Sequence, residues 1–552
     1  MSLKLALKRS AWLKEVVRAW RNLDVPPWNR ITGRDGSRTS ALTSPKRRVL
    51  IATGGAGYAA AKRVESLLAA SLLVEGVEVN VLLCDGALPA CFQTTLDFDS
   101  NEAKFAAQGT SRLNCMTCFK PGRKTFSDLG ARVLSMGELL PGEERSRLEV
   151  LSRVTALSEI RSYSEGGVGI GEHAYAGTLR FYARASLNDR HSEEVLRRYF
   201  LAALITHAAT SRLLGDIRYD RVVLHHGIYV PQGIIADTAR SFDIPTVTWH
   251  VAYRKRCFIF SHDGTYHHTL MSEPNSRWAN RELSDERRST IESYLSSRWG
   301  GSNDQISFSK DFSGSQKASY DFFESDRPTV LMLTNVMWDA QLHYPANAFR
   351  TMIDWVFFTI DHFSKRSDLQ LVIRVHPAEV SGTLPSRQKV AEEVARRYSK
   401  LPENIVLIGP ESPANTYELA KRSDCALIYG TKTGVELTSM GIPTIVAGEA
   451  WIRGKGVTVD VNSPEHYEME LFKLPYGRRL PKVTQERALK YAYHFFFRRM
   501  IFFSSLKNTN DLRAFDFAFS DWSELSKNGD KGLGVVIRGI LSGSEFEFDQ
   551  LD

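Results

Sequence analysis

The feature that most constrains the fold of this chain is a repeated order of short apolar segment, glycine-rich or polar turn, and helix-length segment. The first unit comprises Val49–Thr53, the turn Gly54–Gly57 and a helical stretch from Tyr58 to about Val74, and Val77–Leu83 is the next apolar segment. Strands that alternate with helices in this way predict a parallel sheet, because parallel neighbours need a crossover connection. The chain is therefore expected to be an α/β protein.

The repeated units fall into two groups, which predicts two α/β domains. A chain of 552 residues is also too long for one ordinary hydrophobic core. The stretch 300–326 is rich in glycine and serine, as an interdomain linker would be. Because open parallel sheets bind ligands at the carboxyl ends of their strands, we expect a ligand between the two domains. Further strands are expected at 221–224 and 246–249 in the first group, and at 330–334, 369–375, 405–408, 425–429 and 444–447 in the second.

The positive charge of the chain is concentrated at its beginning. Of the net charge of +8, residues 1–48 contribute +9 and the remaining residues −1. A nearly neutral body argues against a nucleic-acid-binding protein. Residues 1–21 have apolar and tryptophan side chains on one helical face and cations mostly on the other, which fits a helix packed on the protein itself or one lying on an anionic membrane surface. Residues 24–45 have the composition of a linker.

Two observations bear on the compartment. No uninterrupted apolar run approaches the length of about 18 residues that a membrane-spanning helix needs. Met1–Arg21 lacks the compact apolar centre and the cleavage site of a secretory signal. We therefore expect a cytoplasmic protein, with segment 1–21 as a candidate contact to the inner face of the cytoplasmic membrane.

Four of the six cysteines follow the spacing C-x6-C-x23-C-x2-C, at Cys84, Cys91, Cys115 and Cys118. Four thiolates can form a closed tetrahedral zinc site, so a structural zinc is one prediction. An iron–sulfur cluster and unliganded thiols are the alternatives, and no catalytic role is expected here. The two other cysteines, at positions 257 and 425, lie in apolar segments and are expected to be buried thiols.

Polar side chains follow three strands of the second group. Asn335 lies after the first strand, and His376 follows the second strand, with Arg374 two residues before it and Pro377 fixing the turn. His376 alone is more often a structural or capping histidine. Next to Arg374, it could hold a diphosphate or protonate a leaving group.

We call the segment that follows the carboxyl end of a strand its tip. The tip after the fourth strand, Gly430–Glu436, is the most informative. Thr431 and Thr433 place hydroxyls beside the start of a helix, whose amides favour a phosphate, and Lys432 adds a cation. Gly434 allows close backbone approach, and Glu436 could accept both hydroxyls of a ribose. An ordinary turn with N-capping threonines is the alternative, and the Walker A pattern is absent.

These tips carry a resemblance to a known family. The segments Leu333–Val336, Trp338–Asp339, Ile373–Glu379, Leu401–Ile405 and Tyr429–Glu436, with the later Gly441–Pro443, resemble the bacterial capsule polysaccharide biosynthesis glycosyltransferases. This group of GT-B enzymes includes the capsule Kdo transferases and is similar, more loosely, to bacterial sialyltransferases through the His-Pro motif. The strong resemblance covers about 329–460, and the first domain resembles the family only in organisation.

The resemblance implies a GT-B-like fold with two Rossmann-like domains facing a central cleft. Residues 1–47 would be a basic helix and linker, 48–325 the acceptor-side domain, 326–485 the nucleotide-sugar domain, and 486–552 helices that cross back. The donor would contact Asn335, Arg374, His376, Thr431, Lys432, Thr433, Gly434 and Glu436. We expect no catalytic metal, because side chains and a helix N-terminus would hold the donor phosphates.

Glycosyl transfer also needs a base on the acceptor hydroxyl. Candidates in the first domain are Glu172 or His173, and His225 or His226, of which Glu172 and His226 are preferred; His376 would act on the leaving group. An inverting single displacement is expected, because it needs only one base. The acceptor would be a polysaccharide or lipid-linked glycan. The rival hypotheses are a transferase of polyol phosphate from a CDP-linked donor, a nucleotide-sugar epimerase, and a binding partner in capsule assembly.

Overall fold

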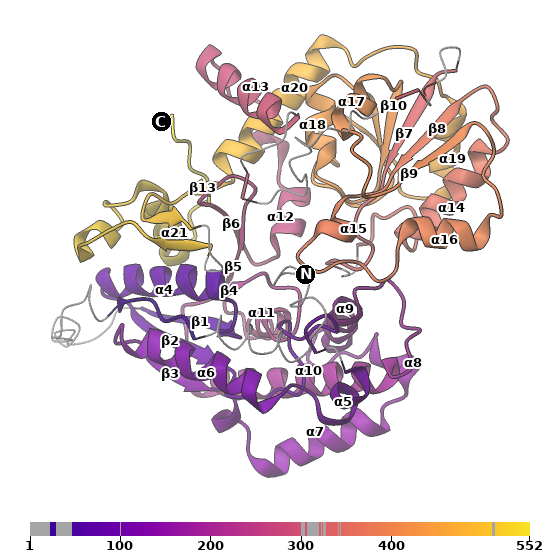
Figure 1. Cartoon of the computed structure of the whole chain (residues 1–552). Coiled ribbons are helices and arrows are strands. Elements are labelled where there is room, and N and C mark those ends of the chain that lie inside the picture. Colours follow the sequence, from indigo (N-terminus) through magenta and orange to yellow (C-terminus); the bar gives the residue numbers. More distant parts are fainter. Residues whose placement is uncertain are drawn as a thin grey trace, which may run out of the picture.

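The computed structural model describes residues 23–28, 47–99, 101–299, 304–305, 320–321, 323, 327–340, 342, 344–509 and 514–551. The predicted basic helix at 1–21 and most of the two predicted linkers lie outside these residues. The described part forms two lobes, each built around its own sheet (Figure 1). The predicted α/β class with two Rossmann-like domains is confirmed.

The first sheet has the strand order β13-β6-β5-β4-β1-β2-β3. Its five strands from β3 to β5 are parallel, whereas β6 pairs antiparallel with β5, and β13 antiparallel with β6. The strands are β1 (Arg48–Gly54), β2 (Glu78–Leu83), β3 (Arg132–Ser135), β4 (Arg221–His225), β5 (Thr246–Val251), β6 (Cys257–His262) and β13 (Ile501–Phe502).

The second sheet is entirely parallel, with the order β12-β11-β10-β7-β8-β9. Its central strands are buried along their whole length, as expected for a parallel sheet covered by helices on both faces. The strands are β7 (Thr329–Leu333), β8 (Gln370–Arg374), β9 (Ile405–Ile408), β10 (Cys425–Ile428), β11 (Thr444–Val446) and β12 (Val459–Asp460).

Helices pack on both faces of each sheet, and separate apolar clusters lie on the two faces of the first sheet. In the first lobe they are α4 (Ala59–Val74), α5 (Glu102–Gln108), α6 (Arg112–Ser127), α7 (Gly142–Val154), α8 (Leu157–Ile160), α9 (Ile170–Tyr182), α10 (Ser192–Asp216), α11 (Gln232–Ser241) and α12 (Tyr266–Ser272). The helix α13 (Asp285–Trp299) leads to the second lobe, which contains α14 (Met352–Phe363), α15 (Ala378–Ser381), α16 (Val390–Arg397), α17 (Thr416–Lys421), α18 (Thr433–Ser439), α19 (Pro464–Phe472) and α20 (Lys482–Tyr493).

The last part of the chain returns to the first lobe (Figure 1). After α20, a π-helical turn at His494–Arg498 leads into β13, and α21 (Lys531–Ser542) packs against α4. A small hairpin of β14 (Leu506–Asn508) and β15 (Phe515–Phe517) lies between them in sequence. The first domain is therefore completed by residues that follow the second one.

The described part of the segment predicted as a linker at 24–45 is anchored instead. Trp28 is fully buried and its ring centroid lies 4.5 Å from that of Phe517. The carboxylate of Asp24 forms an ion pair of 2.9 Å with the buried Arg63 of α4. The start and the end of the described chain thus pack together on one helix of the first domain. No helix in the described ranges is both long and apolar enough to cross a bilayer.

Candidate functional site

The carboxyl ends of the two sheets meet at what we call the seam: the loops after β4 and β5 in the first domain and after β7, β8 and β10 in the second. The Tyr229 hydroxyl, in the loop after β4, donates to Asp339 Oδ1 at 2.7 Å and accepts from the backbone N–H of Ala340 at 2.9 Å. The Lys432 ammonium lies 4.9 Å from the ring centroid of Tyr253. The structure therefore brings together the two sets of strand ends at which ligands were expected.

Two predicted donor ligands, Asn335 and Thr431, lie at adjacent tips of the second sheet. Asn335 Oδ1 accepts from the backbone N–H of Gly430 at 3.4 Å, which ties the tip after β7 to the tip after β10. Thr431 Oγ1 accepts from Thr433 N at 3.3 Å and lies 3.1 Å from Thr433 Oγ1. Thr431 therefore accepts a backbone N–H at the turn into α18, as a turn-forming residue does, and it lies at the edge where a donor would bind.

His376 has a defined tautomer in this setting. Its Nδ1 accepts from the backbone N–H of Ala378 at 3.0 Å, so a neutral ring carries its proton on Nε2. Burial lowers the pKa of His376 to about 4, with Lys432 and Arg374 contributing in the same direction. At neutral pH the ring is therefore an uncharged hydrogen-bond donor rather than a proton carrier.

Arg374 has a structural role that the sequence did not reveal. The side chain is 3% exposed, and its guanidinium donates to the carbonyls of Gly409 and Ser412, the latter at 3.1 Å. Both carbonyls belong to the loop after β9. This guanidinium is directed at the backbone and holds the loop after β9 in place. The structure thus gives Arg374 a role inside the protein, where a contact with a donor phosphate was predicted.

Glu436 was predicted to bind a ribose, and the structure places it elsewhere. Its side chain is fully buried in α18, where Oε1 pairs with Lys432 Nζ and with Arg298 Nε, both at 2.7 Å, and Oε2 accepts from the Tyr417 hydroxyl at 2.6 Å. Although burial opposes ionisation, Lys432 and Arg298 lower the pKa of Glu436. Both oxygens are engaged, so Glu436 positions Lys432 instead of meeting a ligand.

Gly434 is likewise a packing residue rather than a ligand contact. A Cβ at this position would lie 2.6 Å from Ile428 Cδ1 and 2.7 Å from Ile452 Cγ2. Glycine is needed here because α18 packs closely over β10. The predicted contact of Gly434 with a donor stays a prediction.

The two residues proposed as alternative bases on α9 differ in their surroundings. His173 is 3% exposed, with Nε2 at 3.0 Å from Asp237 Oδ2 and Nδ1 next to the carbonyl of Ile228. Burial would lower the pKa of His173, but the Asp237 carboxylate outweighs it and raises the pKa. This pair joins α9 to α11, and Nδ1 contacts the loop after β4. Glu172 is half-buried one residue earlier, and its charge acts on Tyr344 of the second domain.

Four imidazoles gather at the strand ends of the first domain; we call His225, His226, His250 and His267 the histidine cluster. The ring centroid of His250 lies 5.5 Å from that of His225 and 4.9 Å from that of His226. Burial lowers the pKa of all four, to about 3 for His267, so the cluster is uncharged at neutral pH. His226, a preferred base, has a left-handed φ of 66°, and its lowered pKa makes it a weak proton acceptor.

Several seam residues were not predicted from the sequence. His250 lies in the last part of β5, directly after the predicted strand 246–249, so the strand-end rule could have found it. Tyr229 and Asp339 lie in loops whose conformation no local pattern predicts. Arg180 lies in the last turn of α9, next to Phe92 and Tyr229, and no sequence signal separates it from a surface arginine.

The four spaced cysteines do not assemble into a metal site. Cys115 and Cys118 lie within α6, and Cys84 packs on the core on one side of the first sheet while Cys118 packs on the core of the other side. Among the described residues, no three of these thiols lie within 4.8 Å of one another. The predicted four-thiolate zinc site is thus not formed in this structure. The buried state expected for Cys257 and Cys425 is confirmed.

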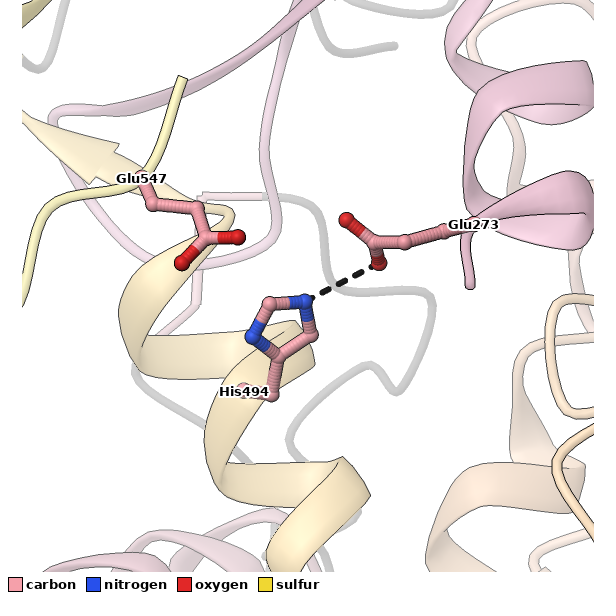
Figure 2. A group of neighbouring side chains, drawn as sticks. All are labelled: Glu273, His494 and Glu547. Atoms are coloured by element: carbon pink, nitrogen blue, oxygen red, sulfur yellow. Dashed lines mark hydrogen bonds and ion pairs between the residues drawn. The ribbon is translucent and has the colours of Figure 1, made fainter. Parts of the chain in front are cut away.

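One group of side chains does have the spacing of metal ligands: Glu273, His494 and Glu547 (Figure 2). His494 Nε2 is 2.9 Å from Glu273 Oε2. Arg499 Nε lies 3.4 Å from Glu273 Oε1, and Arg281 pairs with Glu547 at 2.6 Å. Although burial opposes ionisation, His494 and Arg499 hold the pKa of Glu273 at about 2. Because the arginines already balance both carboxylates, the group fits an ion-pair network that fastens the C-terminal segment to α12 better than it fits a cation site.

Comparison with known protein families finds a match to the second domain. Residues 308–486, about a third of the chain, match a family described as capsule polysaccharide biosynthesis protein. The matched residues cover the second domain, which we call the capsule-synthesis domain. The resemblance drawn from the strand-end motifs is thus confirmed, and the tips at Asn335, His376 and Thr431 all lie inside this capsule-synthesis domain.

The solved structures that match this chain are only distantly similar to it. A β-Kdo 2,4 transferase, KpsC of Thermosulfurimonas dismutans, shares 15% identity over 56% of this chain and 87% of its own, with a TM-score of 0.35. A UDP-GlcNAc 2-epimerase of Neisseria meningitidis shares 11% identity over 81% of this chain and 95% of its own, with a TM-score of 0.23. No curated protein matches the sequence. These likenesses are too remote to indicate an activity for the domain pair.

Proposed function

We propose that this protein is a glycosyltransferase that moves a sugar from a nucleotide-sugar donor to a capsular or lipopolysaccharide acceptor. The observation that carries the proposal is the seam. Polar side chains of the capsule-synthesis domain lie directly opposite the strand ends of the first domain, and Tyr229 bonds to Asp339 across it at 2.7 Å. Two substrates bound at facing strand ends would meet there.

The donor phosphates would lie at the tips after β8 and β10. His376 offers its Nε2–H, and Thr431 and Thr433 offer hydroxyls. Lys432 supplies positive charge: burial and Arg298 lower its pKa to about 8, opposed by Glu436, so most of it is protonated at pH 7. Fixed donors and a cation at the leaving phosphate stabilise the charge that develops there, which is why the proposed reaction needs no divalent ion.

The base on the acceptor hydroxyl is proposed to be a carboxylate rather than His226. A base takes up the proton of the acceptor hydroxyl, and burial, His250 and Arg180 oppose the positive charge that His226 would gain, whereas a carboxylate becomes neutral on accepting a proton. Asp339 is exposed at the seam and is oriented by the Tyr229 hydroxyl, and Glu172 is the second carboxylate nearby. One base suffices for the proposed inversion at the anomeric carbon.

The proposed acceptor is a polysaccharide or lipid-linked glycan at the inner face of the cytoplasmic membrane. The support for this part is the basic and amphipathic sequence of residues 1–21, which suits an anionic surface. Binding of the full-length protein to vesicles with and without an anionic lipid, compared with a chain lacking those residues, tests it. Equal binding of both chains would remove the support.

The donor site is tested with a thermal-shift panel of UDP-, CMP-, GDP- and CDP-linked donors, with and without EDTA. We expect one nucleotide to raise the melting temperature regardless of EDTA, and His376→Asn to abolish the shift. His466→Asn, on α19 of the same domain, is the matched control and should keep it. No shift with any donor would contradict a donor site and favour a binding partner.

The reaction itself is tested on the products. Transfer of the sugar with an inverted anomeric configuration, read by NMR, is the expected result. Release of an epimerised nucleotide-sugar without an acceptor, or transfer of a polyol phosphate, would identify the rival activities. Retention would contradict the single displacement and point to a covalent intermediate on a carboxylate of the seam.

A further inference from the structure

Arg180 is a positively charged side chain on the side of the seam that belongs to the first domain. Its guanidinium donates to the carbonyl of Phe92, and its Cζ lies 6.0 Å from the ring centroid of Phe92 and 5.3 Å from that of Tyr229. Within the ranges the structure describes, it forms no ion pair. Its charge is therefore held in place by a backbone carbonyl and two rings, and not balanced by a carboxylate.

The histidines beside Arg180 have buried nitrogen atoms without hydrogen-bond partners. His225 is 5% exposed, and neither of its ring nitrogens has a partner; Nδ1 of His226 is also buried without one. The ring of His225 lies 5.5 Å from that of Tyr58 and 6.2 Å from that of Phe92, measured between centroids. A buried polar atom without a partner destabilises the fold by about 1–3 kcal/mol, so three of them close together need an explanation.

The main groups that shift the pKa of His225 and His226 include no carboxylate, and among them Arg180 carries the charge at neutral pH. Besides burial, the groups that shift the pKa of His225 are His250 and Arg180, and those that shift the pKa of His226 are His250, His225, His267 and Arg180. Each of them lowers the pKa. Two acids lie near the cluster: Glu65 accepts from Trp249 Nε1 at 3.2 Å and contacts the backbone of His225, and Asp339, which is bonded to Tyr229, partly offsets the lowering of the His250 pKa by burial.

From this arrangement we infer that Arg180, His225 and His226 form a subsite for an anionic group, a carboxylate or a phosphate, carried by the acceptor. An anion there would accept from the guanidinium and from one N–H of each neutral imidazole, which would give the protonated ring nitrogens a partner. The aromatic faces of Tyr58 and Phe92 next to His225 offer a surface for the sugar ring that bears the anion. This inference rests on the proposed function and specifies its acceptor as an acidic or phosphorylated glycan.

The subsite is tested with small sugars that differ only in charge. Glucuronate carries a carboxylate, glucose 6-phosphate a phosphate, glucose no charge and glucosamine a positive charge. Titration calorimetry at constant ionic strength is expected to show saturable binding of one or both anionic sugars and none of the other two. The relative affinity of glucuronate and glucose 6-phosphate tells which anion the acceptor carries.

Variants locate the binding. Arg180→Gln and His225→Gln should each weaken the anionic sugar about tenfold or more, as expected for loss of a charge-assisted or buried hydrogen bond. Lys124→Gln, which removes an exposed cation of α6 in the same domain, is the matched control and should leave binding unchanged. Circular dichroism shows whether Arg180→Gln folds. If it does not, the test uses Arg180→Lys and His225→Gln instead. Arg180→Lys keeps the positive charge but loses the guanidinium, so it should bind the anionic sugar more weakly than the wild type does.

The inference is overturned if neutral glucose binds as well as glucuronate, or if His225→Gln and Lys124→Gln have the same effect. The donor site is read separately. His376→Asn should abolish the nucleotide shift and leave binding of the anionic sugar intact, and His225→Gln should do the reverse. Loss of binding at one site therefore leaves the test of the other site valid.

Discussion

The two edges that meet at the seam are built differently. On the capsule-synthesis side, the charged residues already have protein partners: Glu436 has partners on both oxygens, and Arg374 holds two carbonyls of the loop after β9. On the first domain's side, His225 and His226 are buried with nitrogens that have no partner. One edge is thus rigid before any ligand arrives, whereas the other has unsatisfied polar atoms that a ligand would complete.

The comparison teaches that charged residues in a motif need not be ligands. A buried carboxylate such as Glu436 is stable only when it is paired and hydrogen-bonded, so its partners define its role. The groups at this edge that remain able to donate to a donor phosphate are His376, Lys432 and the two threonines. The predictions below test this division, from the largest expected effect to the smallest.

Loss of the Glu436 carboxylate should have the largest effect. Glu436→Ala leaves Lys432 and Arg298 buried without their counter-charge, and removal of one partner of a buried ion pair costs about 3–5 kcal/mol. Urea unfolding measures the loss, and Glu403→Ala at an exposed position of the same domain should change stability by less than about 0.5 kcal/mol. An unchanged stability with a raised donor KM would restore Glu436 as a ligand.

Arg374→Ala should also act on stability first. It leaves the carbonyls of Gly409 and Ser412 without donors, for an expected loss of about 2–3 kcal/mol. Arg396→Ala, which removes an exposed arginine of α16, is the control and should be nearly neutral. A stable Arg374→Ala protein that fails to bind the donor would show that the guanidinium contacts phosphate after all.

His376→Asn should weaken donor binding at least tenfold, or by at least about 1.4 kcal/mol, so that almost no thermal shift remains at a donor concentration near the wild-type Kd, with little change in stability. Wild-type affinity should also rise as the pH falls. The pKa of His376 is about 4 in the free protein, and a bound phosphate raises it, so binding takes up a proton at a pH between the two values. Donor titrations from pH 5.5 to 7.5 measure this, and the variant should show a flatter profile than the wild type.

Tyr229→Phe should have the smallest free-energy effect of the four variants, a loss of about 1 kcal/mol in stability. It removes one hydroxyl, which bonds to Asp339 and Ala340 N. Tyr398→Phe is the matched control, since its hydroxyl bonds to Asp361 within one domain at 2.6 Å. Both variants should lose similar stability in urea, but only Tyr229→Phe should lower kcat/KM for transfer. Equal activities would mean that the contact across the seam does not orient the reacting groups.

Much of the fold could be predicted from the sequence. Each of the nine strands predicted from apolar runs corresponds to a strand of the structure, from β1 and β2 to β11. The strands that were missed are β3, at the edge of the first sheet, β6, which pairs antiparallel with β5, and the short strands β12, β13, β14 and β15. Strands of two to four residues have too few positions for a periodic pattern to identify them.

The candidate site was predicted less completely. The strand-end rule correctly drew attention to the tips at Asn335, His376 and Thr431, because the end of a parallel strand is a local property of the sequence. It could not tell that Glu436 meets Arg298, which is 138 residues away, or that Cys84 and Cys118 pack on opposite sides of one sheet. Those facts depend on which elements pack together.

The sequence by itself determined the α/β class, the order of the strands along the chain and the polar residues at their ends, since these follow from local apolar periodicity and turn chemistry. Only the tertiary structure decided which of those residues are buried and with which partners. It placed Tyr229 against Asp339 and left the nitrogens of His225 unsatisfied. The physical reason is that burial and pairing depend on neighbours distant in sequence, and a side chain's charge and availability to a ligand depend on both.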